Sequence, residues 1–266
     1  MVNLLSNILL LCFTGHILGD YYLQSDKMSY SKNKKLVRLI FHSLLYAIPF
    51  AVIFVIFGLT MQLGGLLLSV CAAHFFIDLI KFGFYKFGLY KICSEKYKLK
   101  DWTIYLTDQV LHIIAILAIS ILIGSSIPEI RFIPALTDSF RALGIDTVLV
   151  LKWFLLILCI YKPANITFIK IFANYKPGRM EHLTDGASTN SAIDKKAGAI
   201  IGFLERLLIV IFISIQQYSA IGLILTAKSI ARYDNIVKNQ DFAEYYLIGT
   251  LTSVLFSMVF YGIIFS

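Results

Sequence analysis

The chain has 266 residues and a formal net charge of +8, and 58% of its residues are hydrophobic. Soluble domains are about 45–50% apolar and about 25% charged, whereas only 15% of this chain is charged, so the composition excludes an ordinary soluble protein. The basic residues lie in short loops between apolar runs, which is typical of membrane topology, and no nucleic-acid partner is predicted.

Apolar runs of membrane-spanning length predict an all-α fold, a polytopic transmembrane helix bundle of about eight spans. A bilayer core of about 30 Å needs roughly 20 apolar residues in a helix. The runs cover residues 3–24, 36–59, 63–81, 102–123, 146–171, 199–215, 218–230 and 246–265. The segment 218–230 is short and is either a span or re-entrant, which would leave seven spans. We expect Pro163 to kink or break the fifth span.

Loop charges orient the predicted spans. Lys and Arg gather in the loops after the first, third, fifth and seventh spans, and such loops stay cytoplasmic. Both termini are then expected outside the cytoplasm, with the chain in the cytoplasmic membrane. The polar stretch 173–197 divides a five-span front part, 1–172, from a three-span rear part, 198–266.

The front part carries ionisable residues where lipid penalises them, so we expect them to face the bundle interior. Three pairs are spaced four residues apart, which places both side chains on one helix face. The order is His then Asp in spans one and three, and Asp then His in span four, which runs the other way. The three helices therefore present one layer of each type. With His42 of span two, the set is His16, Asp20, His42, His74, Asp78, Asp108 and His112.

Imidazole and carboxylate groups together are typical ligands of a divalent metal ion, with zinc or manganese as the leading candidates. Two metal ions are also consistent with this set. An aspartate that is not a ligand would act as general base, and the candidates are Asp20, Asp78 and Asp108. Two alternatives stay open, a proton or ion pathway and a structural hydrogen-bond network between helices.

The rear part carries a second charged group near the cytoplasmic ends of its spans. Glu205 has Arg206, Lys228 and Arg232 as candidate partners. One interpretation is a set of intramembrane ion pairs with snorkelling basic side chains. The other is a basic pocket for phosphate, supplied by an anionic lipid or a nucleotide. In that interpretation Lys81, Arg206, Lys228 and Arg232 bind the substrate.

Several motifs together resemble a bacterial family of integral membrane proteins labelled as domain of unknown function 3307. They are HILGDYYLQSDK at 16–27, His42, HFFIDLIK at 74–81, TDQVLH at 107–112, GAIIGFLERLLI at 198–209, AIGLILTAKSIAR at 220–232 and EYYLIGTLTS at 244–253. The resemblance implies a membrane location and no particular activity. The H-x-x-x-D spacing is also similar to predicted membrane-bound metal-dependent hydrolases.

The leading hypothesis is a metal-dependent membrane hydrolase that acts on a lipid-linked or phosphate-containing substrate from the cytoplasmic side. The rival hypotheses are a cation or proton transporter or channel, and a non-catalytic membrane scaffold or sensor. A transporter would use the same residues as a relay, and interrupted helices such as the fifth and seventh segments favour it. The oligomeric state is left open.

Overall fold

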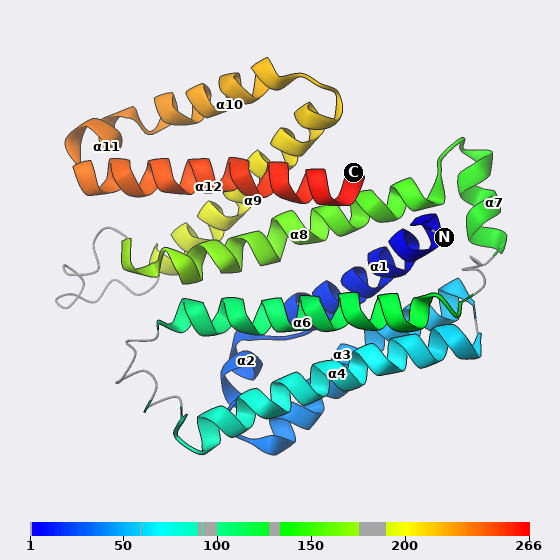
Figure 1. Cartoon of the computed structure of the whole chain (residues 1–266). Coiled ribbons are helices and arrows are strands. Elements are labelled where there is room, and N and C mark those ends of the chain that lie inside the picture. Colours follow the sequence, from blue (N-terminus) through cyan, green and yellow to red (C-terminus); the bar gives the residue numbers. More distant parts are fainter. Residues whose placement is uncertain (1, 59, 90–91, 93–99, 128–133, 176–189) are drawn as a thin grey trace. The chain divides into compact units, whose positions relative to one another are not determined.

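The computed structural model describes residues 2–58, 60–89, 92, 100–127, 134–175 and 190–266, and every regular element in these ranges is helical. The elements are α1 (Val2–Ile17), η1 (Leu18–Tyr22), α2 (Asp26–Lys32), α3 (Leu36–Phe57), α4 (Met61–Lys86), α6 (Asp101–Gly124), α7 (Pro134–Ala142), α8 (Thr147–Ile171), η2 (Ala173–Tyr175), α9 (Asn190–Ser214), α10 (Tyr218–Ala231), α11 (Tyr233–Lys238) and α12 (Gln240–Phe265) (Figure 1).

Six helical segments are long and apolar enough to cross a membrane, which confirms a membrane-type all-helical fold. They are Leu4–Tyr22, α3, α4, α6, α8 and α12. The sixth predicted span falls in α9, and the seventh falls in α10, which has 14 residues and is short for a span. The count of about eight spans stays a prediction.

The chain divides into two compact units, Met1–Leu155 and Leu156–Ser266, and the division falls within α8. The polar stretch 173–197, predicted as the boundary, lies largely outside the residues whose side chains are described. Each unit is described by itself below.

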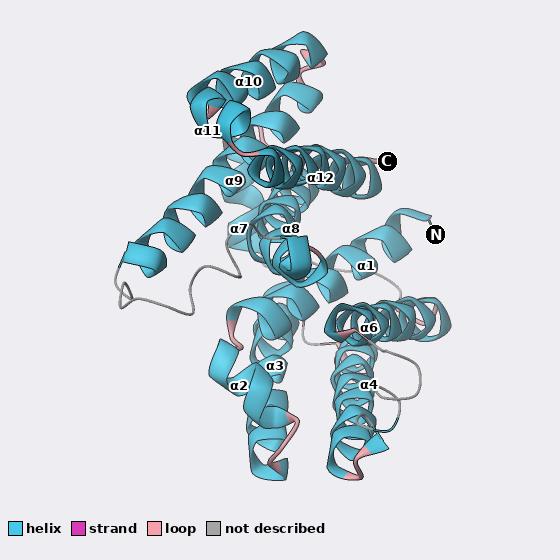
Figure 2. Ribbon diagram, turned by 90° about the vertical axis from the view of Figure 1, so that its left-hand side faces the viewer, coloured by secondary structure: helices cyan, strands magenta, loops and turns pink. Residues whose placement is uncertain are grey.

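The first unit is built around four long helices that pack in a ring. α1 packs against α3 and α6, α3 packs against α4, and α4 packs against α6; Figure 2 looks nearly along α4 and α6. One end of this bundle is an apolar core, which includes Ile8, Phe50, Leu66 and Ile116. The His/Asp residues lie toward the other end, where α1 ends and where α3 and α6 begin.

Two glycines four residues apart let α1 and η1 approach α3 closely. A Cβ atom added to Gly15 would lie 2.9 Å from the Phe50 ring. One added to Gly19 would lie 2.5 Å from Cδ2 of Tyr46 and 3.2 Å from its Cα. Small residues at this spacing are a common feature of close helix pairs in membranes.

In the second unit, α9 packs against α10 and α12, and α11 packs against α12. Arg206 on α9 is buried and donates from Nε to the carbonyl oxygen of Ile160 on α8, at 2.6 Å. Ile160 lies in the turn before Pro163, which remains inside the continuous helix α8. The predicted break at Pro163 is therefore absent from α8, and the alternative, a kink, stays a prediction.

Candidate metal centre

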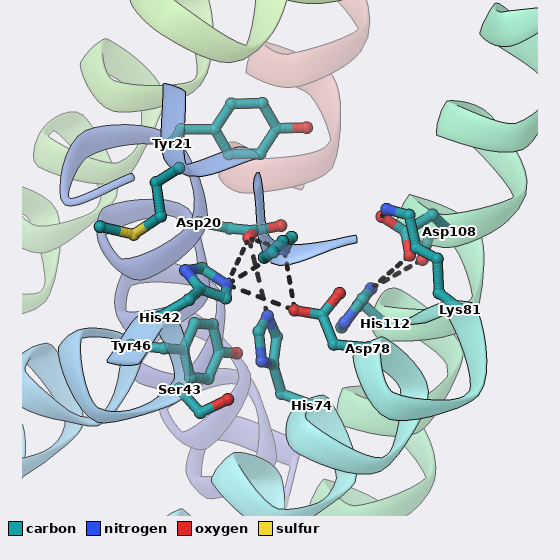
Figure 3. A network of polar contacts seen from close by, with 12 residues as sticks. Asp20, Tyr21, His42, Ser43, Tyr46, His74, Asp78, Lys81, Asp108 and His112 are labelled. Atoms are coloured by element: carbon teal, nitrogen blue, oxygen red, sulfur yellow. Dashed lines mark hydrogen bonds and ion pairs between the residues drawn. The ribbon is translucent and has the colours of Figure 1, made fainter. Parts of the chain in front are cut away.

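The seven ionisable residues predicted to converge do lie together in the first unit, on four different helical segments. His16 is on α1, Asp20 on η1, His42 on α3, His74 and Asp78 on α4, and Asp108 and His112 on α6. Figure 3 shows most of these side chains pointing toward one another. Each is almost fully buried, and His42 has no exposed surface at all.

Asp20 reaches the centre through a π-helical turn. The α-helical hydrogen-bonding of α1 ends at Ile17, and Leu18–Tyr22 forms a π-helix. A π-turn widens the helix by one residue and changes the direction of the side chains that follow, and such turns are frequent at functional sites. The sequence suggested an uninterrupted α-helical face through His16 and Asp20, and the structure differs at this point.

The middle of the cluster holds Lys32, which the sequence placed among the basic loop residues. Its Nζ donates to Oδ2 of Asp78 at 2.8 Å and to Nε2 of His42 at 3.1 Å, and it lies 3.7 Å from Oδ1 of Asp20. Burial alone would lower the pKa of Lys32, but the carboxylates of Asp20 and Asp78 outweigh burial and raise it. The ammonium group is therefore charged at neutral pH.

Several buried donor and acceptor atoms of the cluster have no hydrogen-bond partner. They are Oδ1 of Asp20, Oδ1 of Asp78, Nδ1 of His42, both ring nitrogens of His74 and Nε2 of His112. Most buried polar atoms in proteins are hydrogen-bonded, and an unpaired one costs about 1–3 kcal/mol. So many unpaired atoms at one point indicate a site built for a ligand.

Facing atoms of four of these side chains are spaced like the ligands of a metal ion, and two of them, Nε2 of His42 and Oδ2 of Asp78, accept hydrogen bonds from Lys32. Nε2 of His42 lies 3.4 Å from Oδ1 of Asp20 and 3.4 Å from Oδ2 of Asp78, and Nε2 of His74 lies 3.6 Å from Oδ1 of Asp20. Donor atoms of a tetrahedral zinc site lie about 3.4 Å apart, since zinc–nitrogen and zinc–oxygen bonds are about 2.0–2.2 Å long.

Among the described residues, three overlapping groups could hold a metal ion, each with ligand atoms within 4.8 Å of one another. His74 belongs to two of the groups and Asp78 to two. The groups are His16 with Asp20 and His74, His42 with His74 and Asp78, and Asp78 with Asp108 and His112. Imidazole with carboxylate suits zinc, manganese or iron.

Tyr46 positions two of the histidines. Its ring stacks on His74, with ring centroids 3.5 Å apart, and its hydroxyl is hydrogen-bonded to Nδ1 of His16 at 3.1 Å. Because Nδ1 is used in this bond, Nε2 of His16 is the nitrogen that would bind a metal ion. Such contacts behind a ligand fix the orientation of its ring.

Asp20 is held in place by side chains of α6 and η1. Gln109 donates from Nε2 to Oδ2 of Asp20 at 3.2 Å, and Tyr21 donates to Oε1 of Gln109 at 2.9 Å. The hydroxyls of Tyr21 and Tyr105 are 2.7 Å apart. One carboxylate oxygen of Asp20 is thus anchored, and the other faces the histidines.

The third group has a different partner, Lys81. Nζ of Lys81 donates to Oδ2 of Asp108 at 2.7 Å, and Lys81 keeps 19% of its side chain exposed. Nδ1 of His112 donates to the carbonyl oxygen of Asp108 at 2.7 Å, which leaves Nε2 as the free nitrogen. Lys81 and Asp108 form the more open edge of the cluster.

The basic residues predicted to bind substrate in the rear part belong to the second unit. Lys228 donates to Oε2 of Glu205 at 2.7 Å, so the predicted ion pair forms. Arg206 is buried against α8, and Arg232 is exposed at the end of α10. Their role toward a substrate stays a prediction. His182 lies outside the described residues.

Lys32 and Tyr46 are the residues of the cluster that the sequence did not single out. Lys32 sits among Lys27, Lys34 and Lys35, and nothing in the charge pattern separates it from them. Tyr46 follows His42 by four residues, so the two share a helix face, and that spacing is the one signal available.

Residues 8–137 match the sequence profile of a family described as a protein of unknown function, DUF3307. The match confirms the predicted resemblance to the DUF3307 family. The DUF3307 segment contains all seven ionisable residues together with Lys32, Tyr46 and Lys81.

No curated protein and no solved structure shows significant similarity to the chain. The predicted similarity to membrane-bound metal-dependent hydrolases stays a prediction. The DUF3307 description carries no activity, so the function has to be inferred from the cluster itself.

Proposed function

We propose that the first unit binds a divalent transition-metal ion inside the membrane and hydrolyses a lipid-linked or phosphate-containing substrate there. The observation that carries the proposal is the metal-like spacing of buried His and Asp atoms of Asp20, His42, His74 and Asp78, beside other atoms of the same side chains that have no hydrogen-bond partner. Zinc and manganese are the leading candidates, because the donors are imidazole and carboxylate.

The residues divide into ligands and helpers. Asp20, His42, His74 and Asp78, whose facing atoms lie 3.4–3.6 Å apart, would supply the ligands of the central position, with His16 and His112 beside them. A metal ion bound there would lower the pKa of water and polarise the scissile group. Tyr46 orients the ring of His16, and Gln109 orients the carboxylate of Asp20.

Asp108 and Lys81, at the more open edge of the cluster, would accept a proton and neutralise substrate charge, respectively. Asp108 keeps Oδ1 available to accept a proton from water, while Lys81 holds Oδ2. The ammonium of Lys81 neutralises charge on an anionic substrate. The second unit has cationic groups of its own, Arg206, Lys228 and Arg232, which stay candidates for binding a lipid phosphate or a nucleotide.

The proposed location is the cytoplasmic membrane, with the cluster toward the side of the basic loops. The cluster lies near the end of the bundle where α2 and the segment after α4 connect the helices. These segments are rich in lysine, and lysine-rich loops stay on the cytoplasmic side. The N-terminus is then outside.

Metal analysis of the detergent-purified protein tests the metal centre. We expect at least one zinc or manganese ion per chain, and a marked decrease in the His74→Ala and Asp78→Asn variants. Matched controls are His182→Ala, the one histidine of the sequence that is not among the seven cluster residues, and Asp138→Asn, an exposed residue of α7. Metal-free wild-type protein, or equal metal in all four variants, would refute the centre.

The hydrolytic step needs its own assay. Purified protein loaded with zinc or manganese would be mixed with phosphatidic acid and with a polyprenyl diphosphate, and released phosphate would be measured. We expect release that a chelator abolishes and that Asp108→Asn lowers by about 100-fold or more, as for loss of a general base. Metal binding without any hydrolysis would point away from an enzyme.

Cation translocation is the second candidate, and the position of Lys32 favours it. A cationic side chain already fills the space between two buried carboxylates, as expected of a site that exchanges one cation for another. Metal uptake into proteoliposomes distinguishes the two functions. Chelator-sensitive uptake that Asp78→Asn abolishes would support translocation, and hydrolysis without uptake would support the enzyme.

A further inference from the structure

Lys32 occupies space that the proposed metal ion would need. Its Nζ lies 2.8 Å from Oδ2 of Asp78, 3.1 Å from Nε2 of His42 and 3.7 Å from Oδ1 of Asp20. These are three of the atoms whose mutual spacing fits a metal ion. An ammonium group has three donors and no lone pair, so Lys32 cannot itself be a ligand while charged.

A divalent ion and the ammonium group cannot share this cage without strong repulsion. A metal ion with bonds of about 2.0–2.2 Å to these atoms would come within about 2–3.5 Å of Nζ. Two cations at that separation, away from bulk water, repel each other by several kcal/mol. One of them has to leave.

The charge balance favours the departure of Lys32. Asp108 is already paired with Lys81, so the cage itself carries the two negative charges of Asp20 and Asp78. With Lys32 inserted the net charge is −1; with a divalent ion and Lys32 together it is +1; with the divalent ion alone it is zero. Uncompensated buried charge is costly, and the neutral state is therefore the stable metal-bound one.

The attachment of α2 also favours departure. Lys32 is the one buried residue of this seven-residue helix, and Asp26, Lys27 and Tyr30 are exposed. Met28 is half-buried, and no apolar side chain of α2 is fully buried. Withdrawal of Lys32 would expose little apolar surface, while the charge that it leaves is taken over by the metal ion.

We infer that Lys32 is a built-in competitor of the metal ion, and that α2 is a plug which leaves the cage when metal binds. The inference rests on the proposed metal centre and adds its regulation. In the metal-free protein the plug neutralises part of the cage and closes it. In the metal-bound protein α2 is released at the end of the bundle that carries the basic loops.

Lysine labelling of the wild-type protein tests the inference directly. Detergent-purified protein, with and without saturating zinc, would be treated briefly with an amine-reactive acetylating reagent, and the modified peptides would be quantified by mass spectrometry. We expect Lys32 to be protected without zinc and at least about tenfold more reactive with it. The exposed residues Lys34 and Lys35 are internal controls and should not change.

A metal titration of a Lys32 variant supplies the second measurement. Lys32→Met removes the competing charge, so its affinity for zinc should exceed that of wild type by at least about tenfold. Lys35→Met changes an exposed lysine nearby and should leave the affinity unaltered. Because the metal-free variant is expected to be unstable, it would be purified with zinc and its zinc dissociation rate compared with wild type.

The outcomes separate the inference from the proposed function. Stoichiometric zinc with Lys32 still protected, or weaker zinc binding by Lys32→Met, would overturn the plug and leave the metal centre standing. If sodium or potassium ions at the same ionic strength increased the acetylation of Lys32 as much as zinc does, the release would not be caused by binding of the divalent metal. Absence of zinc binding in both wild type and Lys32→Met would overturn the centre and the plug together.

Discussion

Replacing Gly19 by Ala should displace Tyr46 and thereby disturb the histidines that Tyr46 orients. The added Cβ would lie 2.5 Å from Cδ2 of Tyr46 and 3.2 Å from its Cα. Carbon atoms in good contact are about 3.5–4.0 Å apart, so the two segments must separate by up to about 1 Å. Rotation of the Tyr46 ring cannot provide this, because the Cα is also too close and the ring is stacked on His74 at 3.5 Å.

The magnitude follows from two opposing effects. Overpacking of a close contact costs about 1–3 kcal/mol. Alanine in a helix gains up to about 1 kcal/mol over glycine. We therefore expect Gly19→Ala to lower the free energy of unfolding by roughly 1–2 kcal/mol. Because Tyr46 orients His74 and His16, the metal affinity should also fall by about tenfold, as for other residues behind a ligand.

Gly65→Ala is the matched control for Gly19→Ala. Gly65 lies on α4 of the same bundle, and an added Cβ there meets no atom within 4 Å. It should be neutral or stabilise the protein by about 0.5–1 kcal/mol. Unfolding in mixed detergent micelles and zinc titration measure both quantities. A Gly19→Ala protein as stable and as metal-competent as Gly65→Ala would show that the close approach of η1 to α3 is unimportant.

Three further substitutions test other parts of the structure. Tyr46→Phe keeps the stacked ring but loses the hydroxyl bond to His16, so zinc titration should show an affinity lower by about tenfold with little change in stability. In metal-free protein, Lys32→Met should lower the free energy of unfolding by about 3–5 kcal/mol, because it leaves buried carboxylates without a cationic partner. Adding Asp78→Asn removes one of these carboxylates and should recover part of that loss. Equal stability of the single and double variants would contradict the charge pairing. Arg206→Gln removes the bond to a backbone carbonyl of α8 and should destabilise the protein by about 1–3 kcal/mol in the same unfolding assay, with metal content unchanged.

Helix positions and the meeting of the His/Asp pairs were predictable because both follow from simple periodicities. Lipid requires long apolar runs, and four-residue spacing puts two side chains on one helix face. Asp108 precedes His112 in span four, which runs opposite to spans one and three. This reversed order predicts that the aspartates of the three helices lie in one layer and the histidines in another. The structure brings these side chains within metal-binding distance of one another.

The rest was not predictable because it depends on geometry without a sequence period. The π-turn at Asp20 has no compositional signal, although it sets where that carboxylate points. Lys32 has the same neighbours in sequence as any cytoplasmic lysine, and only the fold of α2 brings it between Asp20 and Asp78. Gly19 is one of 16 glycines, and its role depends on the position of Tyr46.

The pattern of unpaired atoms favours the proposed metal centre over a structural network of hydrogen bonds. A network that serves only to hold helices together gains stability by satisfying its members, and each unsatisfied buried member lowers the stability. Here both ring nitrogens of His74 are unpaired, as are Nε2 of His112 and one oxygen each of Asp20 and Asp78. The same side chains are oriented by well-formed contacts on their other faces, through Tyr46 and the backbone of α6. Side chains that are firmly held on one side and unpaired on the other fit a ligand site, and their imidazole and carboxylate groups are consistent with the proposed metal ion.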